Sequence, residues 1–212
     1  MNMCVSYNAG EFGDFIRYFC GLHTGQIEDT DIIFDNDFMG MHKIILEPNK
    51  HIHITEKLNT DSFLKLFQKS CPPPSTHIYK VKLSTNEDDK HTHNILNTPE
   101  YDIIHSLKHK IIFTELELLS EWGLLFFKRI EMLCKHWNIP YDKKWYVKKF
   151  TKLKEYPKHE LNHILQIDRL LDCDQKEYDK LINFLQCKPK DNWKEIVKKY
   201  TTWIKKDLDN TA

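Results

Sequence analysis

Long apolar runs are missing from this chain of 212 residues. Its longest apolar stretches, such as 122–127, are far shorter than the roughly 20 residues that a membrane-spanning helix needs. The first residues lack the basic start and the apolar middle of a secretion signal. These absences exclude the usual membrane and secreted classes. We therefore expect a soluble protein of the cytoplasm without membrane contact.

Paired cysteine motifs are also missing. The six cysteines are spaced irregularly, and no two of them form a C-x-x-C pair. A zinc knuckle is therefore not indicated. Reduced cysteines that pack as small apolar side chains are the expectation for a chain of this size and compartment.

An excess of one charge is missing as well, because 31 Lys+Arg balance 31 Asp+Glu. The balance is uneven along the chain. Residues 141–212 hold 17 basic and 12 acidic residues, a surplus of +5, and residues 1–140 hold 14 and 19, a deficit of −5. Nucleic-acid-binding proteins usually carry a marked basic excess, so nucleic acid is not the expected partner. Only three of the basic residues are arginines: Arg17, Arg129 and Arg169.

Glycine is confined almost wholly to the first forty residues, and only Gly123 lies beyond them. The N-terminal segment therefore needs backbone freedom that the rest of the chain does not. Residues 3–7 predict a short buried strand, followed by a turn over 8–13. A helix is expected from about Asp14 to Cys20, with Asp14 as its capping residue.

Strand and helix patterns alternate after this first unit. Short β-branched or aromatic segments flanked by turn residues predict strands over 42–46, 51–55, 77–83 and 110–114. A helix is expected over 60–69, ended by three prolines. This alternation predicts a single α/β domain over residues 1–212, with a small, mainly parallel sheet and helices on both faces.

The C-terminal half has helical periodicity and predicts a helical layer on that domain. Helices are expected over 115–138, 146–154, 176–186 and 193–208. In the last of these, Trp193, Ile196, Tyr200 and Ile204 form one apolar stripe. Residues 163–171 are expected to form a final strand that leads into a turn at 172–174.

The strand, glycine-containing turn and helix of residues 5–16 have the layout of a phosphate-binding loop. In such a loop, backbone N–H groups and the helix dipole converge on the anion. The Lys-Ser/Thr pair of a Walker A motif is absent. Glycine turns between strands and helices are also common for structural reasons alone, so both interpretations stay open.

The same loop resembles that of the sulfotransferase-like P-loop proteins, including short versions carried by phages. Residues 6–16, SYNAGEFGDFI, are similar to the family's T-Y-P-K-S-G-T-T-W-like segment. The family's strand with a catalytic histidine is similar to HIHIT at 51–55. Its strand that leads to the donor's 3′-phosphate resembles IYKVKLST at 78–85.

This resemblance implies transfer of a sulfuryl group from phosphoadenosine phosphosulfate to a hydroxyl or amine, in the host cytoplasm if the chain is viral. It implies His53 as the catalytic base. The donor-binding residues implied are Asn8, Ala9, Gly10, Glu11, Phe12, Gly13, Asp14, Phe15, Lys82 and Ser84. The acceptor, a small molecule or a protein, is not identified.

Several features favour other interpretations. The family's loop lysine is absent near Ala9, and Glu11 and Asp14 place negative charge beside the expected phosphate. A non-catalytic interaction protein on the same fold, active between phage and host, is therefore the alternative. A nucleic-acid-binding accessory rests only on the Lys-rich C-terminal region.

The histidines and acidic residues of the N-terminal half allow further interpretations. His53 can also be an ordinary strand histidine, and the two His-x-His pairs at 51–53 and 91–93 can be scattered polar residues or metal ligands. No carboxylate or cysteine lies at a spacing that closes a metal site, so no metal is expected. Glu11 and Asp14 can cap the helix or hold a bridging cation.

Overall fold

A five-stranded parallel sheet forms the centre of the computed structural model, in the order β4-β5-β1-β6-β7. Its strands are β1 (Met3–Asn8), β4 (Ile52–Ile54), β5 (Ile78–Leu83), β6 (Lys110–Glu115) and β7 (Asn162–Gln166). The structure describes residues 3–8, 12–25, 33–35, 43–45, 52–54, 78–83, 110–136, 138, 140–144, 146–147 and 158–210.

Strand β1 lies in the middle of this sheet, between β5 and β6. Both neighbours run parallel to it, with Met3 paired to Ile78 on one side and to Lys110 on the other. The side chain of Val5 is fully buried, as the apolar sequence of a strand covered on both faces predicts. The expectation of an internal, parallel first strand is confirmed.

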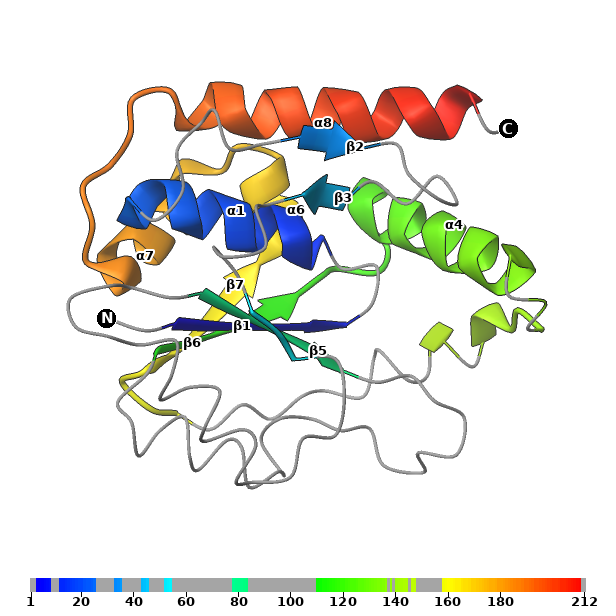
Figure 1. Cartoon of the computed structure of the whole chain (residues 1–212), viewed down its shortest axis with the longest axis horizontal. Helices are drawn as coiled ribbons and strands as arrows, with labels where there is room; N and C mark the ends of the chain where they lie inside the picture. Colours follow the sequence, from blue (N-terminus) through cyan, green and yellow to red (C-terminus); the bar gives the residue numbers. More distant parts are fainter. Residues whose placement is uncertain are drawn as a thin grey trace.

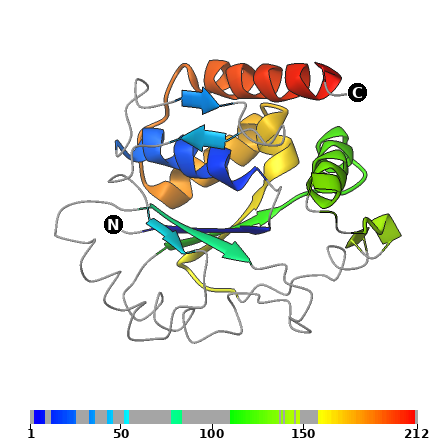
Figure 2. The same ribbon diagram turned by 45° about the vertical axis from the view of Figure 1, so that its right-hand side comes forward.

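Helices α1 (Gly13–Thr24), α6 (Ile167–Leu171), α7 (Gln175–Leu185) and α8 (Trp193–Asn210) lie on one side of the sheet (Figures 1 and 2). Their apolar faces form one core with Val5, Ile112 and Leu165 of the sheet. Helix α7 begins where the side chain of Asp174 accepts hydrogen bonds from two backbone N–H groups. The mixed α/β class is thus confirmed, and helices are described on one face.

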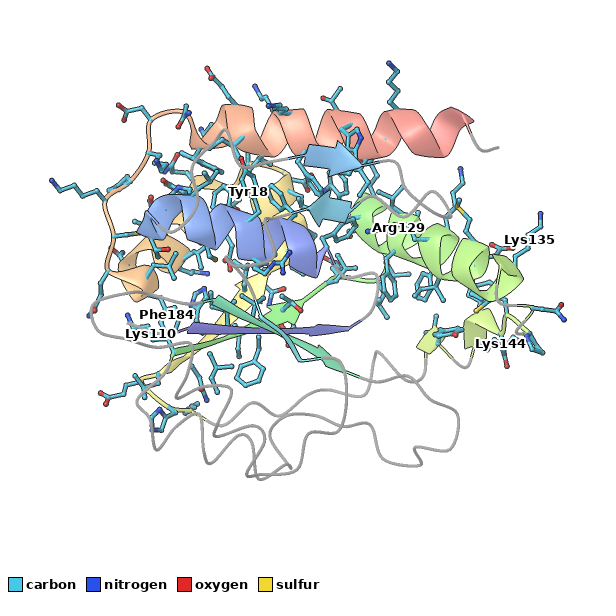
Figure 3. The ribbon with its side chains drawn as sticks, viewed as in Figure 1. Tyr18, Lys110, Arg129, Lys135, Lys144 and Phe184 are labelled. Carbon is cyan, nitrogen blue, oxygen red and sulfur yellow. The ribbon has the colours of Figure 1, made fainter. Side chains whose placement is uncertain are left out.

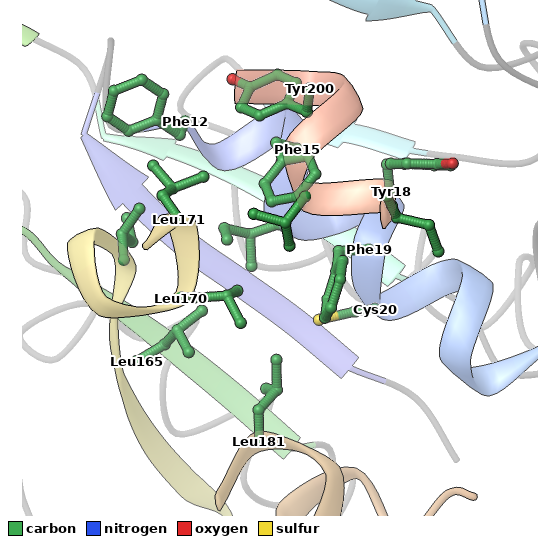
Figure 4. Packing of buried hydrophobic residues seen from close by; sticks show 14 of the residues in the cluster. Phe12, Phe15, Tyr18, Phe19, Cys20, Leu165, Leu170, Leu171, Leu181 and Tyr200 are labelled. Carbon is green, nitrogen blue, oxygen red and sulfur yellow. The ribbon is translucent and has the colours of Figure 1, made fainter. Parts of the chain in front are cut away.

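Helix α8 closes this core from outside, as its sequence predicts. Trp193, Ile196, Tyr200 and Ile204 are all buried. The ring of Tyr200 stacks on that of Phe15 in α1, with centroids 4.1 Å apart and an interplanar angle of 11° (Figure 4). The predicted apolar stripe therefore faces the body of the protein.

Helix α4 (Glu121–His136) follows β6 at the end of the sheet toward which the strands point (Figure 1). Its Phe126, Phe127, Ile130 and Cys134 form a second cluster, against which Tyr141, Tyr146 and Val147 pack. Cys20 and Cys134 are buried free thiols, while Cys173 and Cys187 are partly exposed. Along the described ranges, no helix is long and apolar enough to cross a membrane.

In the second half of the chain, the start of one helix and the extent of the last strand differ from the sequence predictions. The helix expected from residue 115 begins at Glu121, because 110–115 pair in the sheet and Ser120 caps the helix by accepting a hydrogen bond from the N–H of Gly123 at 3.1 Å. The strand expected over 163–171 ends at Gln166. Residues 167–171 turn into α6, which buries Ile167, Leu170 and Leu171.

The N-terminal half adds further differences. Asp14 was expected to cap helix α1, but this prediction is wrong. The helix starts at Gly13, so Asp14 lies inside its first turn. The N-cap is Phe12, whose side chain makes no capping hydrogen bond. Strand β3 (Lys43–Ile45) was expected, but it pairs antiparallel with β2 (Ile33–Asp35) in a separate sheet. The helix expected over 60–69 and most of the one over 146–154 lie outside the described residues.

Candidate functional site

The connections of the sheet run in opposite directions from the carboxyl ends of β1 and β6. The chain leaves β1 through α1 and next enters this sheet at β4, on one edge. It leaves β6 through α4 and enters β7, on the opposite edge. In open parallel sheets, ligands bind where two adjacent strands have connections that run in opposite directions. Asn8, the last residue of β1, lies at this point.

The turn between β1 and α1 ends in a left-handed residue. Phe12 has φ 56° and ψ 19°, and α1 begins at the next residue, Gly13. The N–H of Ile16 donates to the carbonyl of Phe12 at 3.1 Å, closing the first turn of the helix. A residue with a Cβ atom is disfavoured in this conformation, and an aromatic one is a rare exception. Asn8 ends β1 beside Leu83, and Ala9, Gly10 and Glu11 lie outside the described residues.

Helix α4 holds the ring of Phe12. The ring of Trp122 meets it edge-on, with centroids 6.0 Å apart and an interplanar angle of 86°. The guanidinium carbon of Arg129 lies 5.2 Å from the centroid of the Phe12 ring, within the range of a cation–π contact. Figure 4 shows Phe12 at the carboxyl end of β1, with Leu171 beside it. The contacts of the Phe12 ring with α4 therefore help to hold the left-handed conformation of its backbone.

Two of the chain's three arginines are buried, one on α1 and one on α4. Arg17, on α1, is 1% exposed, and Arg129, on α4, is 5% exposed, whereas Arg169 is exposed. Figure 3 shows Arg129 on α4. Burial of a charged group is costly unless its charge is compensated. Of the two, Arg129 places its guanidinium group beside the ring of Phe12.

Carboxylates of α6 and its C-cap hold the turn between β6 and α4. Asp168 accepts a hydrogen bond from the N–H of Glu117 at 3.4 Å, and Asp172 accepts one from Nε1 of Trp122 at 2.7 Å. Burial raises the pKa of Asp168, while its backbone hydrogen bonds oppose that shift. At the ends of β6 and β7, Gln166 Nε2 donates to Glu115 Oε2, and the Gln166 N–H donates to Glu177 at 3.0 Å.

Of the residues expected to bind a donor, Phe12 and Gly13 lie at the carboxyl end of β1, and both are buried. Phe15 is also buried, with its ring against Tyr200. Lys82 pairs with Tyr7, one residue before the carboxyl end of β1. Ser84 lies outside the described residues. The structure thus brings the backbones of Lys82 and the β1–α1 turn to the same end of the sheet.

The expected base, His53, lies on the outer strand of the sheet. Through Lys80, its backbone is in register with Val5, three residues before Asn8. Strand β5 separates it from β1, so the two strands lie about 10 Å apart. His53 and the turn are therefore not adjacent.

Sequence reasoning missed Trp122, Arg129 and Asp168, which contact the turn or its support. One signal for Arg129 was present, because arginine is rare in a chain that uses lysine almost everywhere. Across the described segments, no group of three His, Cys, Asp or Glu side chains has the arrangement to hold a metal ion. His51, His91 and His93 lie outside those segments.

Comparison with known proteins identifies no relative. No protein-family model matches the chain, and no curated protein or solved structure is significantly similar to it.

Proposed function

We propose that this chain binds a nucleotide phosphate at the β1–α1 turn and is a sulfotransferase-type P-loop protein. The observation that carries the proposal is the turn itself. It follows the central strand of a parallel sheet, ends in left-handed Phe12, and enters a helix with no side-chain cap. Strained residues of this kind cluster at ligand-binding sites.

The backbone at this turn suits an anion. A left-handed residue followed by a helical one directs successive N–H groups to one side, the arrangement called a nest. The first N–H groups of any helix have no partner inside the helix, and the helix dipole favours negative charge there. The N–H groups of residues 12–15 are thus the proposed phosphate ligands.

Positive charge for this site comes from outside the loop. The resemblance places a lysine in the loop, but this chain has none there, and Glu11 and Asp14 oppose an anion. Arg129, whose guanidinium carbon lies 5.2 Å from the centroid of the Phe12 ring, is the proposed source of positive charge in place of the missing lysine. Arginine is also the better residue for a partly dehydrated phosphate contact, because its guanidinium group is weakly hydrated and always charged.

The proposed reaction is sulfuryl transfer from phosphoadenosine phosphosulfate to a hydroxyl or amine. The bond from sulfur to the donor's phosphate oxygen breaks, a bond from sulfur to the acceptor forms, and His53 takes the acceptor's proton. The positive charge of Arg129 and the N–H groups of residues 12–15 stabilise the departing phosphate oxygen. Because His53 lies two strands from β1, the acceptor is expected between the turn and β4.

A non-catalytic protein with the same fold is the second candidate. The observation in its favour is the set of charges in the loop, where Glu11 and Asp14 stand and the lysine is missing. A descendant that lost catalysis retains the fold but has no reason to keep the donor site. Nucleotide binding therefore separates the two candidates.

The decisive experiment compares two arginine variants. Arg129→Gln removes the charge at Phe12, while Arg169→Gln removes an exposed charge and serves as the matched control. We expect adenosine 3′,5′-bisphosphate to raise the melting temperature of the parent and of Arg169→Gln, because a ligand that binds only the folded state stabilises it. The shift should shrink in Arg129→Gln. Equal shifts in both variants would remove Arg129 from the site, and no shift in the parent would leave the non-catalytic candidate.

Catalysis needs a separate test on His53. His53→Ala should bind the bisphosphate as the parent does and lose sulfuryl transfer by about 10²–10⁴-fold, the usual contribution of a general base. Transfer at the parental rate in this variant would show that another group takes the proton.

A further inference from the structure

A lysine of the C-terminal helix is connected to the β1–α1 turn through one tryptophan. The Nζ atom of Lys205, on α8, lies 4.5 Å from the centroid of the Trp122 ring. The same Nζ atom lies 2.7 Å from Oε1 of Glu121, the first residue of α4. Lys205 therefore makes two contacts with the first turn of α4, one with an aromatic face and one with a carboxylate.

Trp122 in turn is held from three directions. Lys205 lies over its ring, Phe12 meets it edge-on, and its Nε1 atom donates to Asp172 at 2.7 Å. Trp122 is 2% exposed as a residue, so its ring has little room to reorient. A change at one of these contacts must therefore be accommodated at the other two.

Phe12 depends on such support. A bulky L-residue stays left-handed only where its surroundings hold it there. Its ring has Trp122 on one side and Arg129 at 5.2 Å, and both residues belong to α4. Helix α8 also contacts α1 directly, through the stacked rings of Tyr200 and Phe15. The two helices together fix the start of α1.

We propose that Lys205 is a positioning residue for the β1–α1 turn, acting through the ring of Trp122. Its importance for ligand binding rests on the function proposed above, whereas its effect on the turn does not. The C-terminal helix thereby controls the shape of the anion site, and neutralising a single lysine of α8 loosens that site without unfolding the protein.

Hydrogen exchange at the Ile16 amide reports on the turn, because this N–H donates to the carbonyl of Phe12. Lys205→Met keeps the aliphatic stem and removes the charge. We expect the Ile16 amide to exchange about two- to fivefold faster in this variant, the size of effect that an exposed cation–π contact supports. The indole Nε1–H signal of Trp122 should shift as well. The Leu181 amide of α7, whose side chain is buried, should exchange at the parental rate.

Glu121→Gln is the matched control. It removes the ion pair and leaves the ammonium group over the Trp122 ring, and the side chains of Glu121 and Lys205 are 70% and 43% exposed. We expect little change at Ile16 in this variant, because exposed ion pairs contribute little. Equal acceleration in both variants, acceleration of Leu181 to the same extent, or no change at Ile16 in Lys205→Met would each overturn the proposal.

The nucleotide is added only afterwards. With adenosine 3′,5′-bisphosphate, Lys205→Met should bind several-fold more weakly than Glu121→Gln. If the exchange result holds and the parent binds no bisphosphate, the positioning role stands and the proposed function falls. If the parent binds and Lys205→Met exchanges as the parent does, the proposed function stands and the positioning role falls.

Discussion

The Nε2 atom of His23 lies 3.1 Å from the hydroxyl of Tyr178, and this contact joins α1 to α7. Nδ1 of the same ring lies 2.8 Å from the carbonyl of Phe19, so Nδ1 carries the proton and Nε2 accepts from Tyr178. The Tyr178 oxygen then accepts from the N–H of Lys190 at 2.8 Å. Each polar atom of this buried group has a partner only while His23 is neutral.

Acid should therefore weaken the protein through His23. Burial lowers its pKa from 6.5 to about 4, against the opposing effect of the Phe19 carbonyl. Between these values the unfolded chain binds a proton that the folded chain does not, so stability falls as the pH falls from 6.5 toward 4 and is unaffected by this group above that range. The loss is about 3 kcal/mol at the lower end.

The measurement is urea unfolding of the parent and of His23→Gln over this pH range. The parent should lose stability more steeply than the variant, and their difference isolates His23 from His163, whose pKa is also lowered by burial. Parallel pH profiles would show that His23 titrates normally in the folded state.

Gly123 should not tolerate a side chain. A Cβ atom built there would lie 2.5 Å from the carbonyl carbon and oxygen of Leu118, and it would also meet the carbonyl oxygen of Glu117. These are backbone atoms of the turn that leads into α4. We expect Gly123→Ala to destabilise the protein by about 1–3 kcal/mol, although alanine favours helices.

Gly25 provides the comparison. It has φ +73°, and a Cβ atom there meets nothing within 4 Å, so Gly25→Ala should cost only the ~1–2 kcal/mol of the left-handed conformation. Denaturant melts of both variants test the point. A Gly123→Ala protein as stable as the parent would mean that the turn at 117–118 moves freely.

Removal of α8 should expose the core. Tyr200→Ala deletes the ring that stacks on Phe15 and should cost about 3–5 kcal/mol, whereas Lys198→Ala on the exposed side should change stability by less than about 0.5 kcal/mol.

Deletion of residues 190–212 should cause aggregation, because it uncovers the apolar surface of α1 and α7. A truncated protein with the parental melting temperature would show that α8 is a separate tail.

The indole of Trp122 needs an acceptor at position 172. Asp172→Ala leaves Nε1 without its partner at 2.7 Å and should cost about 1–3 kcal/mol. Asp172→Asn keeps a carbonyl oxygen there and should lose less. Equal losses in the two variants, measured by thermal unfolding, would show that the charge of Asp172 and not the hydrogen bond supports α4.

The sequence predicted those elements whose signals are local. The apolar residues of 3–7 indicated a buried strand, and the helical period of 193–208 indicated α8 and its inward face. Residues 167–171 were wrongly predicted as part of the preceding strand. The helix that they form has only five residues, and their apolar side chains continue the apolar sequence of that strand. The start of α4 was detectable, since Ser120 followed by acidic Glu121 is a helix start signal.

The candidate site was predictable only in part. The strand and the helix on either side of the turn were predicted because glycines and a strand–helix pattern lie close together in the sequence. The support of the turn was not, because Trp122 and Arg129 contact Phe12 across more than one hundred residues, and no periodicity encodes that contact. The left-handed conformation of Phe12 was hidden for the same reason, since it depends on this packing and not on a local preference.

Calorimetric titration with adenosine 3′,5′-bisphosphate tests the central claim most directly, that the turn between β1 and α1 holds a phosphate. The parent should give a saturable one-to-one heat. Gly13→Val should abolish it by filling the space beside the backbone, and Asp14→Lys should strengthen it by replacing repulsion with attraction. No heat with the parent together with no gain in Asp14→Lys would contradict the account and leave residues 8–13 as a structural turn.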